Sequence, residues 1–295
     1  MKAGILRTVG VPRERFSEDF LRVLRALRFA GQFDLTIDQP TWQALLGAVP
    51  ELTRLSPERV QEEIMKVLSQ AQRPSIALRL YLESGALAVL YPEVAGAEVG
   101  TGSDPTDFDR ALAVCDALRP SRPLVRFVAL LALVKSMTGG EAEGVRGAVA
   151  GLMERLRFSN ADTRRVSSMV ATVYLDPPTT DAIEVRRWLS QAGRDHVRDI
   201  ARIWIAEART GEEGAEPTPG EVRDRIRTLR RMLSTAPPLS ISDLALDGSR
   251  LKELGFLPGP RFAEMLSYLL ERVLERPELN NQFDLEVVLA SGGFL

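Results

Sequence analysis

The sequence predicts an all-α fold in which many helices form an elongated array. Apolar residues recur with the spacing of helices, whereas the strict alternation typical of strands is scarce. Glycine and proline divide the chain into segments of about 10 to 20 residues, a usual length for globular helices. With 295 residues, of which 45% are hydrophobic, the chain can bury a substantial core.

Residues 16–30 predict the first long helix. Ser17 is a good N-cap, and Glu18 and Asp19 would lie in the first turn, where the helix dipole favours acids. Each step of three residues rotates about 300° around a helix, so we expect a buried helix that presents one ridge of guanidinium groups, formed by Arg22, Arg25 and Arg28. The simpler alternative is a solvated stripe with an ordinary ion pair between Glu18 and Arg22.

Further element boundaries follow from caps and breakers along the chain. One helix is predicted to begin at Ser56–Pro57 and another at Pro74, the second ending near Gly85. The segment 211–220 is rich in Gly, Pro and Glu and is the best linker candidate. Around Leu251–Arg261 we expect two amphipathic helices joined by a Gly/Pro hairpin. The predicted domains are residues 1–90, 91–210 and 211–295.

Composition excludes several classes of protein. The single cysteine, Cys115, rules out a disulfide framework, and with one histidine, His196, no Cys- or His-based metal site can be assembled. A net charge of −2 argues against general coating of nucleic acid, although residues 1–28 carry seven basic and three acidic side chains. The longest apolar run, Leu124–Val134, contains Arg126 and is too short to span a bilayer. We therefore expect a cytoplasmic protein.

Three motifs resemble those of a known family. Within Val9–Ala30, the pattern Glu-Asp-x-x-Arg-x-x-Arg-x-x-Arg-Phe-Ala resembles the nucleotide-recognition helix of class II tRNA nucleotidyltransferases, which comprise the CCA-adding enzymes and bacterial poly(A) polymerases. Ser56–Glu63 resembles the next motif of that family, in its neck. The tail of bacterial CCA-adding enzymes resembles the hairpin at Leu251–Arg261, together with Asp243–Gly248 and Leu279–Asn280. This resemblance favours an enzyme that acts on tRNA over a poly(A) polymerase. The domains predicted above would then be neck, body and tail.

The resemblance implies how a nucleotide base would be selected. Cytosine and adenine each present an amino donor beside a ring-nitrogen acceptor, whereas uracil and guanine present a carbonyl beside an N–H. Asp19 would accept from the amino group and Arg22 would donate to the ring nitrogen, with Glu18 orienting Arg22. Arg25 and Arg28 complete the nucleotide-binding set implied by the motif. The implied contacts with RNA phosphates are made by Arg15, Lys252, Gly259 and Arg261.

The same resemblance implies chemistry that this chain is expected to lack. The family's catalytic head holds Mg²⁺ on paired carboxylates and should precede the first motif, yet Met1 stands directly before Arg7–Gly10. Asp107 and Asp109 are better explained as loop and helix-start acids than as metal ligands. We therefore expect neither catalytic residues nor a metal site here, because the chain is truncated, has a misassigned start or works with a separate head.

The predicted body resembles a degenerate His-Asp phosphohydrolase-like helical module. Arg126–Leu131 resembles the start of such a module, but Ala132 and Leu133 occupy the positions of its His-Asp pair. Phosphohydrolase chemistry is therefore not expected.

The resulting functional prediction is the base-selecting and RNA-binding portion of a tRNA CCA-adding nucleotidyltransferase. Its expected partners are CTP, ATP, the tRNA acceptor arm and a catalytic head that supplies Mg²⁺. Alternatives are a non-catalytic tRNA-binding adaptor, or one subunit of a split nucleotidyltransferase or poly(A) polymerase. An adaptor would bind tRNA with a strong dependence on salt but without base selectivity.

Overall fold

The computed structural model describes residues 4–95, 107–134, 141–173, 181–211 and 218–294. In these ranges the chain is helical apart from two parallel strands of two residues each, β1 (Ile5–Leu6) and β2 (Thr36–Ile37), which pair Ile5 with Thr36. The all-α prediction is confirmed. The chain forms two compact units: unit 1 contains residues 1–175 and 198–219, and unit 2 contains residues 176–197 and 220–295. No helix within the described ranges is both long and apolar enough to cross a membrane.

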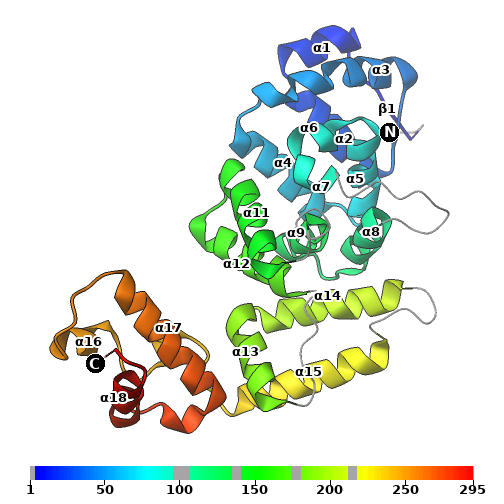
Figure 1. Ribbon diagram of the computed structural model, residues 1–295. Coiled ribbons are helices and arrows are strands. Elements are labelled where there is room, and N and C mark those ends of the chain that lie inside the picture. The colour runs from blue at the N-terminus through cyan, green and yellow to red at the C-terminus, as the bar shows by residue number, and fades with distance from the viewer. Residues whose placement is uncertain (1–3, 96–106, 135–140, 174–180, 212–217, 295) are drawn as a thin grey trace. The chain divides into compact units, whose positions relative to one another are not determined.

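The first part of unit 1 holds short helices around a buried central helix, α2 (Figure 1). Its elements are α1 (Pro12–Glu18), α2 (Leu21–Phe33), α3 (Gln39–Ala48), the 3-10 helix η1 (Val49–Arg54), α4 (Pro57–Gln70), α5 (Pro74–Glu83), α6 (Ala86–Leu90) and α7 (Pro92–Ala95). The predicted helices at Ser56–Pro57 and Pro74 are present. Ser56 is the N-cap residue of α4, but its hydroxyl makes no capping hydrogen bond.

The α2 helix packs against α4 and α5 through an apolar face, as its sequence pattern predicts. Val23, Leu24 and Leu27 are fully buried on this face. At Gly31 the helix meets the backbone of α5, since a Cβ atom there would lie 2.4 Å from the amide nitrogen of Ala77. Only a glycine permits this approach.

The predicted start of α2 is wrong. Ser17 lies inside α1, where its hydroxyl donates to the carbonyl of Glu14, and α2 begins four residues later at Leu21. Pro12 opens a separate short helix, and the extended backbone of Asp19 (φ −155°, ψ 105°) ends it. The acids therefore lie at a junction between two helices and not in the first turn of one.

The second part of unit 1 packs against the first through α4, α5 and α8, α9. Its helices are α8 (Asp107–Ala117), α9 (Pro123–Leu131), α11 (Ala142–Arg155), α12 (Asn160–Val173) and, from Arg198, α14 (Val197–Thr210). In α9, Arg126 is buried and donates to the carbonyl oxygen of Leu68 at 2.7 Å. Cys115 and Trp204 are buried core residues.

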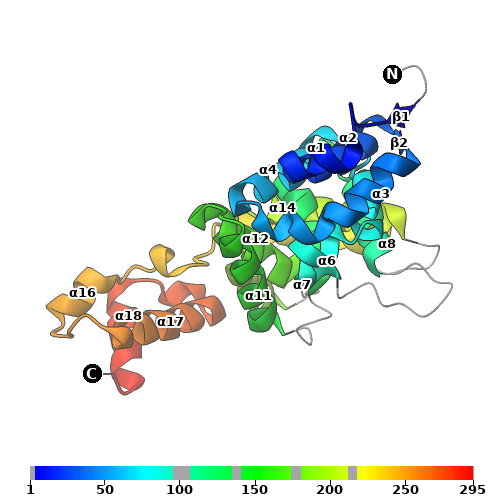
Figure 2. The same ribbon diagram turned by 90° about the horizontal axis from the view of Figure 1, so that it is seen from above.

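Unit 2 is built around α17, which packs with α13 and α18; α16, α17 and α18 lie together in both ribbon views (Figure 2). Its elements are α13 (Ala182–Ala192), α15 (Pro219–Ser234), η3 (Ile241–Asp243), α16 (Gly248–Glu253), α17 (Pro260–Glu275), η4 (Pro277–Leu279) and α18 (Gln282–Ser291). The predicted helical hairpin at Leu251–Arg261 is therefore present. Most of the predicted linker 211–220 lies outside the described residues.

Candidate functional site

The candidate site lies at the junction of α1 and α2. Glu18 is the last residue of α1, Asp19 follows in extended conformation, and α2 begins at Leu21. One carboxylate oxygen of Asp19 accepts the backbone N–H of Leu21 at 3.1 Å, and the carbonyl of Asp19 accepts the N–H of Arg22 at 3.0 Å. The junction therefore holds a carboxylate at the positive end of the α2 dipole, beside Arg22.

Glu18 connects two arginines. Its carboxylate accepts from Arg22 Nη1 at 2.5 Å and from Arg15 Nη1 at 3.0 Å, and Arg22 Nη1 also donates to the carbonyl of Arg15 at 2.8 Å. The hydrogen bonds from Arg22 and then Arg15 lower the pKa of Glu18 below its ordinary value. An ionised Glu18 thus holds the fork of Arg22 in place, in the geometry that an orienting residue requires.

Asp19 has a partner that the sequence analysis did not include among the site residues. Arg59 of α4 donates from one nitrogen, Nη2, to both carboxylate oxygens of Asp19, at 3.1 and 3.0 Å. The two side chains are 47% and 32% exposed, so a solute can reach the pair. The available signal was the place of Arg59 within the Ser56–Glu63 motif, but a contact across 40 residues has no local signature.

The three arginines of α2 do not form the single ridge that was predicted. Arg25 is exposed, with its guanidinium 5.9 Å from the centre of the Phe29 ring. Arg28 is buried and donates to Glu63 of α4 at 2.7 Å. Two steps of about 300° leave the third arginine about 120° away from Arg22 around the axis, which turns it into the interior. The geometry therefore favours a supporting role for Arg28, joining α2 to α4.

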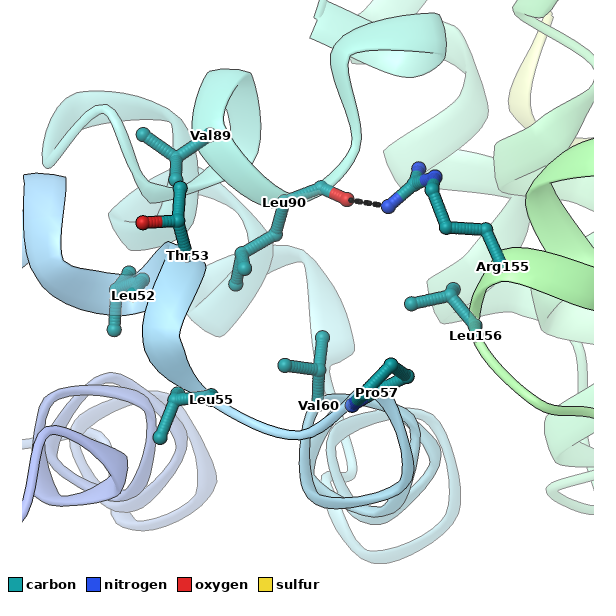
Figure 3. Close-up of a pocket in the computed structure, with 9 residues that line it drawn as sticks. All are labelled: Leu52, Thr53, Leu55, Pro57, Val60, Val89, Leu90, Arg155 and Leu156. Carbon is teal, nitrogen blue, oxygen red and sulfur yellow. Dashed lines mark hydrogen bonds between the residues drawn. The ribbon is translucent and has the colours of Figure 1, made fainter.

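A small apolar cavity lies beside the start of α4 (Figure 3). Its volume is about 260 Å³, and Pro57 and Val60 of α4 line one side. Arg155 reaches it, but its guanidinium donates to the carbonyl of Leu90 at 3.1 Å and to Glu93 at 2.9 Å. Its lining is otherwise mainly apolar, so this cavity lacks the free polar groups that a nucleotide base requires.

The predicted RNA contacts of the tail lie in unit 2 and are all exposed. Lys252 belongs to α16, Gly259 is the N-cap residue of α17 and Arg261 lies in the first turn of α17. Neither Lys252 nor Arg261 has an ion-pair partner among the described residues. Arg15, in unit 1, instead belongs to the Glu18 network.

Metal binding has no support in the part of the chain that the structure describes, where no group of three or more acidic, histidine or cysteine side chains could hold an ion. Asp107 and Asp109 are engaged by Arg110 at 3.1 Å and by Arg79 at 2.6 Å. Because both carboxylates are paired with guanidinium groups, they do not fit a Mg²⁺ site.

Comparisons with known proteins agree with the motifs. A sequence family described as "Probable RNA and SrmB- binding site of polymerase A" matches residues 34–97. The CCA-adding enzyme of Lactobacillus delbrueckii is 24% identical over 98% of this chain and 64% of its own length. That of Latilactobacillus sakei is 29% identical over 95% and 62%, and that of Leuconostoc mesenteroides is 45% identical over 27% and 20%.

Solved structures show the same fold. A CCA-adding enzyme from Bacillus stearothermophilus in complex with CTP matches with a TM-score of 0.63 and 21% identity, over 99% of this chain and 66% of the other. Another CCA-adding enzyme with CTP gives 0.51 and 18%, over 100% and 65%. The chain thus spans 62–66% of the length of those proteins that it matches over nearly its whole length.

Proposed function

We propose, from the premise that this chain is a member of the CCA-adding enzyme/poly(A) polymerase family, that it selects the incoming nucleotide and holds RNA for a tRNA CCA-adding nucleotidyltransferase. The observation that carries the proposal is the α1–α2 junction. There, a backbone hydrogen bond joins the N–H of Arg22 to the carbonyl of Asp19, and a partner from another helix holds each of the two side chains.

Asp19 and Arg22 match the edges of cytosine and adenine. The Asp19 carboxylate has acceptor sites beyond those used by Arg59, because each oxygen carries two lone pairs. Arg22 uses only Nη1 in its described contacts, which leaves its other N–H groups to donate. An amino group facing Asp19 and a ring nitrogen facing Arg22 therefore give two charge-assisted hydrogen bonds. Uracil and guanine would instead place a carbonyl acceptor against the Asp19 carboxylate and an N–H donor against the Arg22 guanidinium.

The relatives are named CCA-adding enzymes, and two solved neighbours are complexes with CTP. For this chain we propose CTP and ATP as the nucleotide donors and a tRNA 3′ end as the acceptor. In this chain we assign the grip on RNA phosphates to Arg15 near the junction and to Lys252, Gly259 and Arg261 in unit 2. The transfer step would require Mg²⁺ held by carboxylates of a catalytic head, and among the described residues no group of acidic, histidine or cysteine side chains could hold it.

The test is label incorporation into tRNA lacking its 3′ CCA, with the chain alone and with a family catalytic head added in trans. Asp19→Asn and Arg22→Gln should each reduce the preference for CTP over UTP by about tenfold or more, since one hydrogen bond to a charged group contributes about 1.5–3 kcal/mol. Arg110→Gln, which breaks an exposed ion pair on α8, is the matched control.

Unchanged nucleotide preference in both site variants would refute the assignment of Asp19 and Arg22. Binding of tRNA without head-dependent incorporation would instead favour the non-catalytic adaptor.

A further inference from the structure

A second cluster of arginines lies in unit 1, on α12, on α14 and at the start of α9, and shares one carboxylate. Figure 1 labels these three helices. Asp199 of α14 is only 4% exposed at its side chain. It accepts from Arg122 at 3.2 Å, from Arg165 at 2.5 Å and from Arg202 at 2.5 Å. We call these four residues the Asp199 cluster.

The Asp199 cluster carries an excess of two positive charges. None of its arginines has another acidic partner among the residues that the structure describes, so one carboxylate serves three guanidinium groups. The arginine side chains remain 36–46% exposed, which leaves several of their N–H groups facing solvent. The Nε atom of Arg165 is buried without a hydrogen-bond partner. Two arginines would be enough to tie α9 and α12 to α14, so Arg202, which lies on the same helix as Asp199, adds positive charge without joining a further helix.

The sequence around the cluster adds further positive charge. Arg119, Arg164 and Arg198 each lie within three residues of a cluster member, are exposed and lack an ion-pair partner in the described ranges. The neighbouring acid Asp162 is held by the hydroxyl of Ser159 at 2.8 Å. This part of unit 1 therefore favours an anion with several charged groups over a single small ion.

We propose that the Asp199 cluster binds phosphodiester groups of an RNA backbone. A buried carboxylate fixes the three forks before the ligand arrives, so little side-chain freedom is lost on binding. Guanidinium forks match phosphate oxygens in pairs, and such contacts position a nucleic acid without reading its sequence. The assignment rests on the proposed function, in which this chain holds tRNA.

The test is the affinity of the chain for fluorescent tRNA lacking its 3′ CCA, measured by anisotropy from 50 to 300 mM KCl. Arg122→Gln and Arg202→Gln should each weaken binding by about tenfold at low salt. Each should also reduce the slope of log K against log salt by about one. Arg110→Gln is again the control, because it removes an exposed arginine that has its own acid.

Unchanged affinity and slope in both variants, with tRNA still bound by the unmodified chain, would overturn this proposal alone and leave the cluster as a tie between helices. Failure of the unmodified chain to bind tRNA would overturn the proposed function as well. A melting temperature raised by inorganic phosphate in the unmodified chain but not in Arg122→Gln, with equal tRNA affinities, would identify a free-phosphate site and refute the RNA assignment.

Discussion

Replacement of Glu63 by leucine should destabilise unit 1 more than most single substitutions. The Glu63 side chain is 2% exposed and accepts from Arg28 Nε at 2.7 Å, where Arg28 is 7% exposed. Without Glu63, the charge of Arg28 stays buried and has no acidic partner among the described residues. Its remaining contacts are with Gln32 at 3.2 Å, Gln70 at 3.4 Å and the ring of Phe29, whose centre lies 4.2 Å from the guanidinium carbon. Removing one member of a buried ion pair costs about 3–5 kcal/mol.

The expected change can be measured by calorimetry. For a unit of this size, about 2–4 °C of melting temperature correspond to each kcal/mol, so the free energy lost should lower the transition by about 6–20 °C. The double variant Arg28→Met with Glu63→Leu replaces the pair by apolar groups of similar volume and should recover most of the loss. Asp107→Asn, in a pair that is 60% and 66% exposed, should cost less than about 1 kcal/mol.

A loss below about 1 kcal/mol for Glu63→Leu alone would refute the reasoning, because it would mean that water reaches Arg28. So would a double variant whose loss equals the sum of the two single losses, since the two charges would then act independently. The pair also joins α2 to α4, the helices that carry Arg22 and Arg59. Under the proposed function, Glu63→Leu should therefore also weaken the preference for CTP over UTP.

Three other predictions concern single positions. Gly31→Ala should destabilise the chain by about 1–3 kcal/mol or more, because the added methyl group overpacks the contact with α5. Gly151→Ala, in a helix with open space around it, should be neutral or stabilising by up to about 1 kcal/mol. Denaturant unfolding measures both free energies, and equal effects would contradict the close approach at Gly31. Burial raises the pKa of Cys115 to about 12, so a thiol reagent at pH 8 should react only after unfolding, and rapid labelling of the native chain would contradict this. Arg22 and Arg15 lower the pKa of Glu18 in the folded chain, so its contribution to the free energy of unfolding should be complete above the ordinary pKa of 4.5. That contribution should be lost as pH falls through the lower folded pKa. A carboxyl NMR titration of Glu18 with its midpoint at or above pH 4.5 would contradict this.

Helix spacing and proline positions predicted much of the fold from local information. Pro74 does begin α5, and the apolar face of α2 is buried, because both signals act within one or two turns. The start of α2 was mispredicted at Ser17 because a good N-cap residue can equally lie inside a preceding short helix that begins at Pro12. Whether residues 12–33 form one helix or two depends on the backbone conformation of Asp19, which is extended here.

The candidate site shows the same division. The contact between Glu18 and Arg22 could be predicted, since residues four apart on a helix are neighbours. The contact is present in the structure although the two residues belong to different helices. The contact between Asp19 and Arg59 depends on how α4 packs against α2, which no local pattern specifies. Burial of Arg28 follows from the helical rotation once the buried face is known.

The close approach at Gly31 limits how the proposed base preference could change. Arg22 lies nine residues away along α2, about 13 Å by the rise of a helix. Because only a hydrogen atom fits between Gly31 and the backbone of α5, α2 can neither slide nor rotate without separating the two helices. Under the proposed function, a new specificity would therefore arise by exchanging side chains at Asp19 or Arg22. A designer who transplants this helix must transplant its contact with α5 as well.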